Sequence, residues 1–537
     1  MPSEAYKALY AYEYERSPDQ DAATPVRHPV IVIGAGPIGL ATAIDLAQRG
    51  QPVVLLDDND RIGEGSRAIC FSKRALEVCD RLGVADRMVE KGVTWQVGKV
   101  FLEDERVYEF DLLPEAGHKH PAFINLQQYY VEAYLVERAM ELDNLEIRWR
   151  NKASGVEQTD DCARLTIDTP DGPYDVEADY VVACDGARSD MRALLGLDFL
   201  GQVFQDRFLI VDVKMHAEFP TERWFWFDPP FHKGQSTLLH KQPDDVWRID
   251  FQLGADADPE VETREENVAP RLKAMLGDVD YSIEWVSVYT FQCMRMEKFI
   301  HDRVIFAGDA AHQVSPFGAR GANSGFEDAQ NLAWKLDEVL TGRAPADLLR
   351  SYALEREFAA DDNIGHSTRA TDFISPKNAI SRVFRNATLK LAKHAPFARR
   401  MVNSGRLSVP SHYRDTPLTT PDEDMFGGTA KPGLPAPDAP LEDAAGKPVW
   451  LLDSLDPGFT VLAVTNGARP NVPEGMSLSV IGEDLHDTDG LFVQRYDARP
   501  GTLYLIRPDQ YVCARFRTFD ADALAQAHAR AKGEHVG

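Results

Sequence analysis

The sequence has little of what marks secreted, membrane-spanning or metal-binding proteins. It carries six cysteines in 537 residues, and none of them lies in a C-x-x-C pair or in a cluster with metal-ligand spacing. We therefore expect reduced thiols, no metal site and a cytoplasmic location. No apolar run is long enough to cross a bilayer, and the polar N-terminus lacks the pattern of a signal peptide.

Basic residues are also in short supply. There are 58 Lys and Arg residues against 85 Asp and Glu residues, so the formal net charge is −27. Because so acidic a chain is a poor partner for nucleic acid or an anionic membrane, we expect it to bind neither. Any anionic ligand must be held by local arginines or by helix N-termini. The apolar fraction of 44% and the length indicate a globular enzyme of about three domains.

The most informative stretch is residues 29–60, PVIVIGAGPIGLATAIDLAQRGQPVVLLDDND. Four apolar residues predict a buried strand, a glycine-rich turn follows, and residues 40–49 have the spacing of a helix that ends at Gly50. A second apolar strand ends at Asp57. This strand–helix–strand unit is the context that makes a G-x-G-x-x-G turn a dinucleotide-binding fingerprint. The turn spans residues 34–39, and the residues in it that we expect to bind the cofactor are Gly34, Gly36, Pro37, Ile38 and Gly39.

Each glycine of this turn has its own role. Gly34 allows the tight turn, Gly36 lets the backbone approach a pyrophosphate, and Gly39 lets the helix pack closely against the strand. The free N–H groups at the start of the helix would receive the phosphates. Asp57 lies where a carboxylate accepts hydrogen bonds from a ribose.

Two later strands end in polar loops of the same kind. Residues 180–183 are apolar and lead into Asp185-Gly186, and residues 303–307 lead into Gly308-Asp309. Ligands of open α/β sheets lie at the carboxyl ends of the strands, so three such exits predict one extended ligand along this edge. Between the second and third exits, residues 207–294 are rich in apolar strands and aromatics, which predicts an inserted β-sheet.

This order of motifs resembles the FAD-dependent aromatic hydroxylases of the p-hydroxybenzoate and phenol hydroxylase type. The resemblance covers about residues 29–380 and is most specific in residues 308–336, GDAAHQVSPFGARGANSGFEDAQNLAWKL. Its details look closest to the 3-(3-hydroxyphenyl)propionate hydroxylase branch. Residues 503–512, LYLIRPDQYV, are similar to the thioredoxin-like tail of the phenol hydroxylases. Without a C-x-x-C pair, this tail is expected to serve packing and subunit contact in a homodimer instead of redox exchange.

The resemblance implies an α/β fold, α+β overall: a Rossmann-like FAD-binding domain with an inserted β-sheet substrate domain and a C-terminal thioredoxin-like domain. Residues 1–27 would form an arm over the surface or a disordered extension. The remaining predicted boundaries are residues 28–92, 122–200 and 295–380 for the FAD-binding domain, 93–121 and 201–294 for the substrate domain, 381–440 for a helical segment and linker, and 441–537 for the thioredoxin-like domain.

The resemblance also implies which residues hold FAD. The glycine-rich turn would hold its pyrophosphate, and Asp57 its adenosine ribose. Arg67 matches an arginine near the flavin, Gln128 a glutamine at the ribityl or phosphate region, and Asp309 an aspartate on the ribityl chain. Asp185-Gly186 belongs to a motif linked to both FAD and NAD(P)H. Gly308 completes the third exit, and the residues expected against the isoalloxazine ring are Pro316, Gly321, Ala322 and Asn323.

Three residues depart from the family pattern. Members often have Pro-x-Gly-Gly-x-Gly-Met-Asn where this chain has PFGARGAN at residues 316–323. Ala319 and Ala322 therefore alter the expected loop. Asp58, which we also count among the cofactor-binding residues, stands where many members carry a basic residue.

The implied reaction is hydroxylation of a phenol, usually ortho to its hydroxyl, with NAD(P)H and O2 through a flavin C4a-hydroperoxide. A 3-(3-hydroxyphenyl)propionate-like phenol of aromatic catabolism exemplifies the substrate class. The phenol itself and the choice between NADH and NADPH stay open. His240 and Tyr289, and after them Asp250, could deprotonate the phenol, and Arg248 could bind a substrate carboxylate. Pro316 completes the catalytic set, and the sheet residues also fit purely structural roles.

Two other functions fit part of the sequence. Residues 224–229, WFWFDP, partly match the W-x-W-x-I-P signature of flavin-dependent halogenases, although Arg223 and Asp228 replace its glycine and isoleucine. An aromatic strand in a core or pocket wall explains the same run more simply. The second alternative is a flavin-bound interaction protein without catalytic activity.

Overall fold

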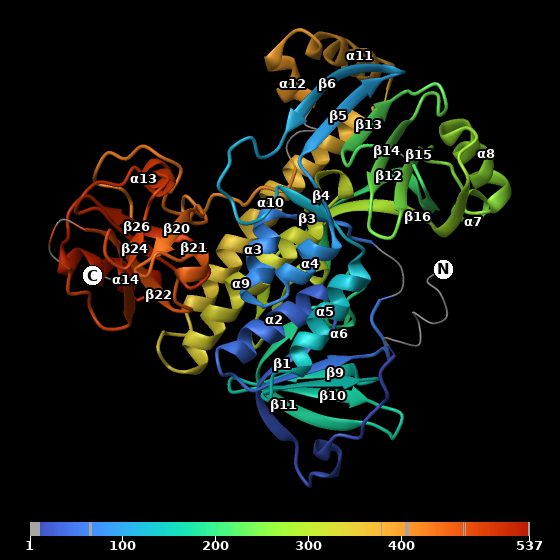
Figure 1. The fold of residues 1–537 in the computed structure, drawn as a ribbon. Coiled ribbons are helices and arrows are strands. Elements are labelled where there is room, and N and C mark those ends of the chain that lie inside the picture. Colours follow the sequence, from blue (N-terminus) through green and yellow to red (C-terminus); the bar gives the residue numbers. More distant parts are fainter. Residues whose placement is uncertain are drawn as a thin grey trace.

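The computed structural model describes residues 11–63, 67–217, 219–376, 378–402, 407–465, 467 and 469–534. Within these residues the chain forms four β-sheets with helices packed against them (Figure 1). Residues 1–10 of the predicted N-terminal arm lie outside the described residues. In the described part, no helix has the length and apolar character needed to span a membrane. The same part holds no cluster of three or more metal-ligating side chains.

The first sheet carries the dinucleotide fingerprint. Its central strands consist almost entirely of apolar residues, because both faces of these strands are covered. Val30 and Ile31, for example, are fully buried. Its parallel strands, in the order β18-β11-β1-β2-β8, are β1 (Val26–Ile33), β2 (Val53–Asp57), β8 (Leu145–Trp149), β11 (Tyr174–Ala183) and β18 (Val304–Phe306). The remaining strands, antiparallel to their neighbours, are β9 (Lys152–Gln158), β10 (Ala163–Asp168) and β17 (Ile300–His301).

The parallel order brings the three predicted exits together. The carboxyl ends of β1, β11 and β18 lie at one edge, where the Cys184 amide donates to the Ile33 carbonyl and the Ala307 amide to the Ala183 carbonyl. Helix α2 (Pro37–Gln48) leaves this edge and packs against α5 (Gln128–Met140) and α9 (Gly321–Leu340). The prediction of a Rossmann-like domain is confirmed.

The second sheet is the predicted insert. Its strands, in the order β19-β16-β12-β15-β14-β13-β5-β6, are β5 (Val97–Leu102), β6 (Glu105–Asp111), β12 (Phe199–Met215), β13 (Arg223–Phe227), β14 (Ser236–Lys241), β15 (Val246–Leu253), β16 (Tyr281–Met296) and β19 (His312–Gln313). Its outer face packs under α8 (Glu265–Leu276) through side chains such as Leu209 and Ile249. Helix α8 and the short α7 (Pro259–Glu262) lie beside this sheet in Figure 1. Because side chains alternate along a strand, Phe208, Ile210 and Asp250 lie on the opposite face.

A third, small sheet joins β3 (Cys70–Ser72), β7 (Phe123–Asn125) and β4 (Val93–Trp95). The sequence assigns residues 93–95 to the substrate domain, but in the structure they pair with β7. The Trp95 indole donates to Asn125 Oδ1 at 2.8 Å, a bond that fixes this pairing. The helices beside the first and third sheets are α3 (Lys73–Arg81), α4 (Ala85–Lys91) and α6 (Asp190–Leu194).

Helices follow the second sheet, and a C-terminal domain completes the chain. The helices are α10 (Leu348–Ile374), α11 (Ala379–Ala392) and α12 (Pro396–Val402), and the last two lie above β5 and β6 in Figure 1. The C-terminal domain is thioredoxin-like, with β22 (Phe459–Val464) parallel to β23 (Met476–Ile481) and antiparallel to β25 (Leu503–Ile506). Its other elements are β20 (Pro440–Asp443), β21 (Pro448–Trp450), β24 (Leu485–His486), α13 (Leu491–Tyr496), β26 (Val512–Phe516) and α14 (Ala521–Ala531).

The C-terminal domain docks on α3, α9 and α10 through buried charges. Arg507 donates to both carboxylate oxygens of Glu355, at 2.6 and 3.1 Å, and Arg74 donates to the Asp509 carbonyl at 2.8 Å. Lys335 also donates to Glu355, at 2.8 Å. Cys513 of this domain is buried.

Candidate active site

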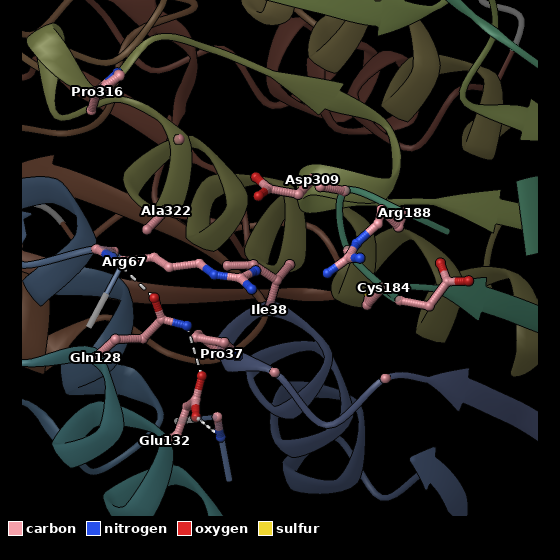
Figure 2. Close-up of a pocket in the computed structure, with 18 of the residues that line it drawn as sticks. Pro37, Ile38, Arg67, Gln128, Glu132, Cys184, Arg188, Asp309, Pro316 and Ala322 are labelled. Atoms are coloured by element: carbon pink, nitrogen blue, oxygen red, sulfur yellow. Dashed lines mark hydrogen bonds between the residues drawn. The ribbon is translucent and has the colours of Figure 1, made fainter. Parts of the chain in front are cut away.

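A cavity of about 1140 Å³ lies between the first and second sheets (Figure 2). One end is lined by the glycine-rich turn, Asp57 and Asp58. The other end is lined by the inner face of the second sheet, including Phe208 and Asp250. The predicted residues that line it are Gly34, Gly36, Pro37, Ile38, Asp57, Asp58, Arg67, Gln128, Asp185, Gly186, His240, Arg248, Asp309, Pro316, Gly321, Ala322 and Asn323.

Three predicted residues lie outside this lining: Gly39, Gly308 and Tyr289. The two glycines are required by packing. A Cβ on Gly39 would lie 1.8 Å from the Gly34 carbonyl oxygen, and Gly308 has a φ of +61° beside Ile38. Tyr289 stands opposite Phe208 on the sheet; burial raises the pKa of its hydroxyl, and its hydrogen bond with Arg67 lowers it.

Of the first two glycines in the turn, Gly34 is crowded by the backbone and Gly36 has open space beside it. Gly34 has a φ of +99°, and a Cβ there would lie 2.6 Å from the Cys184 carbonyl oxygen. A Cβ on Gly36 would instead meet no atom within 4 Å. Gly36 is also the N-cap of α2, and no side chain caps this helix. The helix start therefore offers uncapped N–H groups to a ligand at the turn.

The acid at the end of β2 is held in place by the backbone. One carboxylate oxygen of Asp57 accepts from the Ala35 amide at 2.6 Å, and the other accepts from the Asn59 amide at 2.8 Å. Burial raises the pKa of Asp57, and these hydrogen bonds lower it. Asp58 is exposed, and its carboxylate accepts from the Asn59 side chain at 2.7 Å.

Gln128 and Glu132 hold the loop that follows β2. Gln128 Oε1 accepts from the Ala68 amide at 3.0 Å, and Gln128 Nε2 donates to Glu132 Oε1 at 2.8 Å (Figure 2). Glu132 Oε2 accepts from the Gly63 amide at 2.7 Å. These bonds position the loop that carries Arg67, whose side chain extends across the cavity in Figure 2. Residues 64–66 of this loop lie outside the described residues.

Two further carboxylates face the middle of the cavity. Asp185 Oδ2 accepts from the Met191 amide at 2.9 Å, while Asp185 Oδ1 is buried and has no hydrogen-bond partner among the described residues. Asp309 is exposed to the cavity (Figure 2). The surrounding cavity walls desolvate both carboxyl groups and raise their pKa, and His312 and Arg67 lower the pKa of Asp309.

The start of α9 forms the wall beside the second sheet. Residues Pro316–Gly318 form a short 3₁₀ turn, and Ala319 adopts the left-handed conformation with a φ of +49°. Asn323 Oδ1 accepts from the Ser72 amide at 2.9 Å, and its Nδ2 donates to the Cys70 carbonyl at 3.0 Å. Asn323 thus ties the helix start to β3, and no side chain caps the helix.

The end formed by the second sheet combines apolar and charged groups. Its apolar lining is Phe208, Ile210, Leu238, Phe291 and Phe317. Arg248 makes a two-pronged ion pair with Asp212, with both N–O distances 2.8 Å. This pair occupies the guanidinium that the sequence suggested for a substrate carboxylate. His240 is buried, and its pKa lies well below 6.5 because of burial and of the nearby Arg223 and Arg248.

The aromatic run of β13 does not form a halogenase-like pocket. Trp226 stacks on Phe101 with ring centroids 5.2 Å apart, and Trp224 packs against Phe219. Both tryptophans belong to the apolar cluster under α8, and neither lines the cavity. These two residues fit the simpler prediction of an aromatic strand in the core.

The comparison with known proteins identifies the family. Residues 27–367, more than half of the chain, match the family model described as FAD binding domain. The chain is also 32% identical over 520 residues to 6-methylpretetramide 4-monooxygenase of Streptomyces rimosus, with 90% of each chain covered. This chain belongs to the FAD-dependent aromatic hydroxylases.

Two further matches agree with this assignment. The hydroxylase is 30% identical to 3-(3-hydroxy-phenyl)propionate/3-hydroxycinnamic acid hydroxylase of Mycolicibacterium gilvum, over 82% of this chain and 76% of the relative. The solved structure of the flavin-dependent monooxygenase PieE, in complex with FAD and substrate, shares the fold with a TM-score of 0.81. That match has 23% sequence identity and covers 95% of this chain and 100% of PieE.

The residues present in this hydroxylase fit FAD. Within the described part of the chain, Gly36 leaves room for a pyrophosphate at an uncapped helix start, and Asp185 Oδ1 lacks a partner beside the cavity. An FAD hydroxyl or ring N–H would satisfy such a buried acceptor. The uncapped start of α9 lies at the cavity between the two sheets, where its partial positive charge would stabilise a reduced, anionic flavin.

Sequence reasoning missed several residues of this hydroxylase site. Glu132 positions the loop after β2, and its signal was its place four residues after Gln128 on one helix face. Arg188 lines the cavity just after Asp185-Gly186 (Figure 2). Arg223 was seen only as a departure from the halogenase signature, yet it lines the cavity and is buried.

Proposed function

We propose that this hydroxylase uses FAD, a reduced nicotinamide and O2 to hydroxylate a phenolic ring, most often ortho to the hydroxyl. The observation that carries the proposal is one continuous cavity. It runs from the dinucleotide fingerprint at Gly36 to the apolar face of the second sheet at Phe208. A flavin held along the first part would therefore meet an aromatic substrate in the second.

Bound FAD would supply the transfer of electrons from the nicotinamide and the activation of O2. The chain's own residues bind and orient both partners. Phe208, Phe291 and Phe317 line the substrate end, where they offer rings against which an aromatic substrate packs. The same apolar wall excludes water from the reacting ring, a condition that favours hydroxylation over release of hydrogen peroxide.

The nicotinamide has no second dinucleotide fingerprint in this chain. Arg67 and Arg188 both line the cavity, carry positive charge and are exposed, so they are suited to hold the nicotinamide's phosphates or to close over it. NADH and NADPH are both compatible with these two arginines. We further propose that the enzyme is a homodimer in the cytoplasm. Size-exclusion chromatography with light scattering tests the dimer, and cell fractionation tests the location.

The decisive experiment is anaerobic stopped-flow reduction of the FAD-loaded enzyme by NADH and by NADPH, with and without each member of a phenol panel. We expect at least one phenol to accelerate reduction of the flavin, because substrate-stimulated reduction avoids wasteful oxidation of the nicotinamide. In air, the hydroxylated product formed should match the O2 consumed. Production of hydrogen peroxide alone across the whole panel would show that the proposal is wrong.

The same measurements separate the two alternatives. A halogenase needs chloride or bromide and an external flavin reductase, so its activity depends on added halide. A flavin-bound interaction protein shows no change in the rate of flavin reduction with any phenol. Trp224 and Trp226 pack in the core under α8, a position that favours neither a halogenase nor an interaction protein.

A further inference from the structure

Two charged side chains in the substrate wall lack ionic partners. Asp250 makes no hydrogen bond and no ion pair with any described residue, and its Oδ1 is buried. Arg223 is 7% exposed; among the described residues it makes one hydrogen bond, from Nη2 to the Phe317 carbonyl at 3.3 Å, and its Nε has no partner there. An unpaired buried charge is strongly destabilising, so its retention at a cavity points to a ligand that pairs with it.

The sheet register places these groups on one face of three neighbouring strands, β13, β14 and β15. His240 pairs with Arg248, and Leu238 pairs with Asp250, across β14 and β15. Trp224 pairs with Leu239 across β13 and β14, which puts Arg223 beside His240 on the same face. Arg223, His240, Arg248 and Asp250 therefore form one polar patch within an otherwise apolar wall.

The other members of the patch are poorly suited to take a proton. His240 lies between two guanidinium groups that oppose a positive charge on its ring. Arg248 carries a positive charge that Asp212 binds at Nε and Nη2, and its Nη1 donates to the Arg67 carbonyl at 3.4 Å. Tyr289, which is not part of the patch, lies outside the cavity lining. Asp250 is the one member that combines a free carboxylate with a place in the lining among the described residues.

We propose that Asp250 accepts the proton of the substrate's phenolic hydroxyl while Arg223 donates to the oxygens of the substrate, and that the substrate is an uncharged phenol with a carbonyl oxygen next to its hydroxyl. This inference rests on the proposed phenol hydroxylation. In the step itself the phenolic O–H bond breaks, its electron pair stays on the oxygen, and the proton moves to a carboxylate oxygen of Asp250. The phenolate that results is the electron-rich ring that hydroxylation requires.

The charges of the patch decide the substrate class. A hydroxyl that donates to Asp250 beside a carbonyl that accepts from Arg223 satisfies both unpaired groups at once. A carboxylate tail would bring a second negative charge beside Asp250, and Arg248 is already neutralised by Asp212. The wall therefore disfavours a carboxylate-bearing phenol of the 3-(3-hydroxyphenyl)propionate kind.

The protonation equilibrium of Asp250 fits this role. Burial raises the pKa of Asp250, Arg248 and Arg223 lower it, and Asp212 raises it, to a result of about 6. Charged and titratable groups on the neighbouring elements are Arg223 (β13), His240 (β14), Arg248 (β15), Asp212 (β12) and Cys70 (β3). Since a proton acceptor must be ionised, the rate of turnover should rise with pH through about 6.

The test compares Asp250→Asn with a matched surface control, Asp256→Asn, which changes an exposed aspartate in the loop after β15. Both proteins are assayed as FAD-loaded enzymes on two phenols, one neutral at the assay pH and one already ionised by electron-withdrawing substituents. We expect Asp250→Asn to lower kcat about 100-fold on the neutral phenol, to lose the rise near pH 6, and to approach the wild-type rate on the ionised phenol. The control should behave as the wild type on both.

The substrate class is tested with a phenol that carries an ortho acyl group and with 3-(3-hydroxyphenyl)propionate. The wild type should have the higher kcat/KM on the acyl phenol, and Asp250→Asn should lower the KM for the carboxylate phenol. A tenfold or greater wild-type preference for the carboxylate phenol would overturn the assignment of the substrate class. Equal losses for Asp250→Asn on the neutral and the ionised phenol would overturn the role of Asp250.

These outcomes differ from a failure of the proposed function. If the wild type hydroxylates no phenol, the proposed function fails, whereas activity that is insensitive to Asp250→Asn rejects only the inference. FAD content and reduction by nicotinamide alone show whether the variant is folded. Asp250→Ser is the second variant, because it removes the charge with a smaller side chain should the amide disturb packing.

Discussion

The carboxylate of Asp328 accepts a hydrogen bond from the backbone amide of Gly308, with Oδ2 2.9 Å from the nitrogen. The same oxygen lies 2.7 Å from His312 Nε2, and Oδ1 pairs with Arg356. A side chain of α9 therefore fixes the turn after β18 that presents Asp309 to the cavity. The buried carboxylate of Asp328 therefore links the position of α9 to the geometry of the cofactor site.

Replacing Asp328 by Asn should lower both stability and FAD affinity. The change removes one of two carboxylates paired with the buried Arg356 and leaves Glu327 at 3.4 Å, so we expect a cost of about 3 kcal/mol. Urea unfolding of the FAD-free protein measures the loss, and fluorescence titration with FAD measures the affinity. Asp361→Asn, which breaks the more exposed pair with Arg295, should cost less than about 1 kcal/mol. A loss at Asp328 no larger than that of this control would contradict the linkage.

Acid should weaken the docking of the C-terminal domain through Glu77. Burial acts to raise the pKa of Glu77, but Lys73 and Arg74 outweigh it and lower the pKa to about 2. A lowered folded-state pKa adds stability that is fully present above the unfolded value of 4.5 and is lost as pH falls toward 2. The shift corresponds to about 3 kcal/mol.

Glu77→Gln tests this pH dependence. Arg74, which pairs with Glu77, also donates to the Asp509 carbonyl in the C-terminal domain. Urea unfolding at pH values from 7 to 3 should show a steeper fall in stability for the wild type than for Glu77→Gln. Parallel curves for the two proteins would show that Glu77 does not carry the dependence.

Two glycines of the fingerprint should respond differently to alanine. Gly39→Ala places a Cβ 1.8 Å from the Gly34 carbonyl oxygen, so the turn must distort, and we expect poor folding. Gly36→Ala places its methyl group in open cavity space, so the protein should fold normally and bind FAD at least tenfold more weakly. Thermal unfolding without FAD separates the two variants, and FAD titration measures the second effect. Unchanged FAD affinity in Gly36→Ala would place the pyrophosphate elsewhere.

Ala319→Gly should stabilise the loop before α9. A left-handed conformation costs a non-glycine residue about 1 kcal/mol, and Ala319 has a φ of +49°. Glycine removes that strain but adds freedom to the unfolded chain, so the expected net gain is about 0.5 kcal/mol. Ala387→Gly in the exposed part of α11 is the control and should lose about 1 kcal/mol. Equal losses in both variants would show that Ala319 is not strained.

Local patterns in the sequence were enough to predict the cofactor half of the site. The turn from Gly34 to Gly39, the acid at Asp57 and the later exits at Asp185 and Asp309 each follow an apolar strand. Parallel strands end at one edge, so their exits come together without further information. Gly39 and Gly308 show the limit of this reasoning, because Gly39 packs on the Gly34 backbone, Gly308 packs on the Ile38 side chain, and neither lines the cavity.

The substrate half was decided by tertiary structure. Whether Arg248 is free, whether His240 can hold a proton and whether Asp250 has a partner all depend on the neighbouring strands of the second sheet. Strand register and burial determine those neighbours, and the local spacing of residues in the sequence predicts neither of them. The sequence by itself determined a dinucleotide-binding sheet, because backbone turns obey local rules, and the order of its motifs resembled the FAD-dependent aromatic hydroxylases. Only the folded sheet decided which buried charge remains unpaired beside the substrate, because pairing is a contact between distant residues.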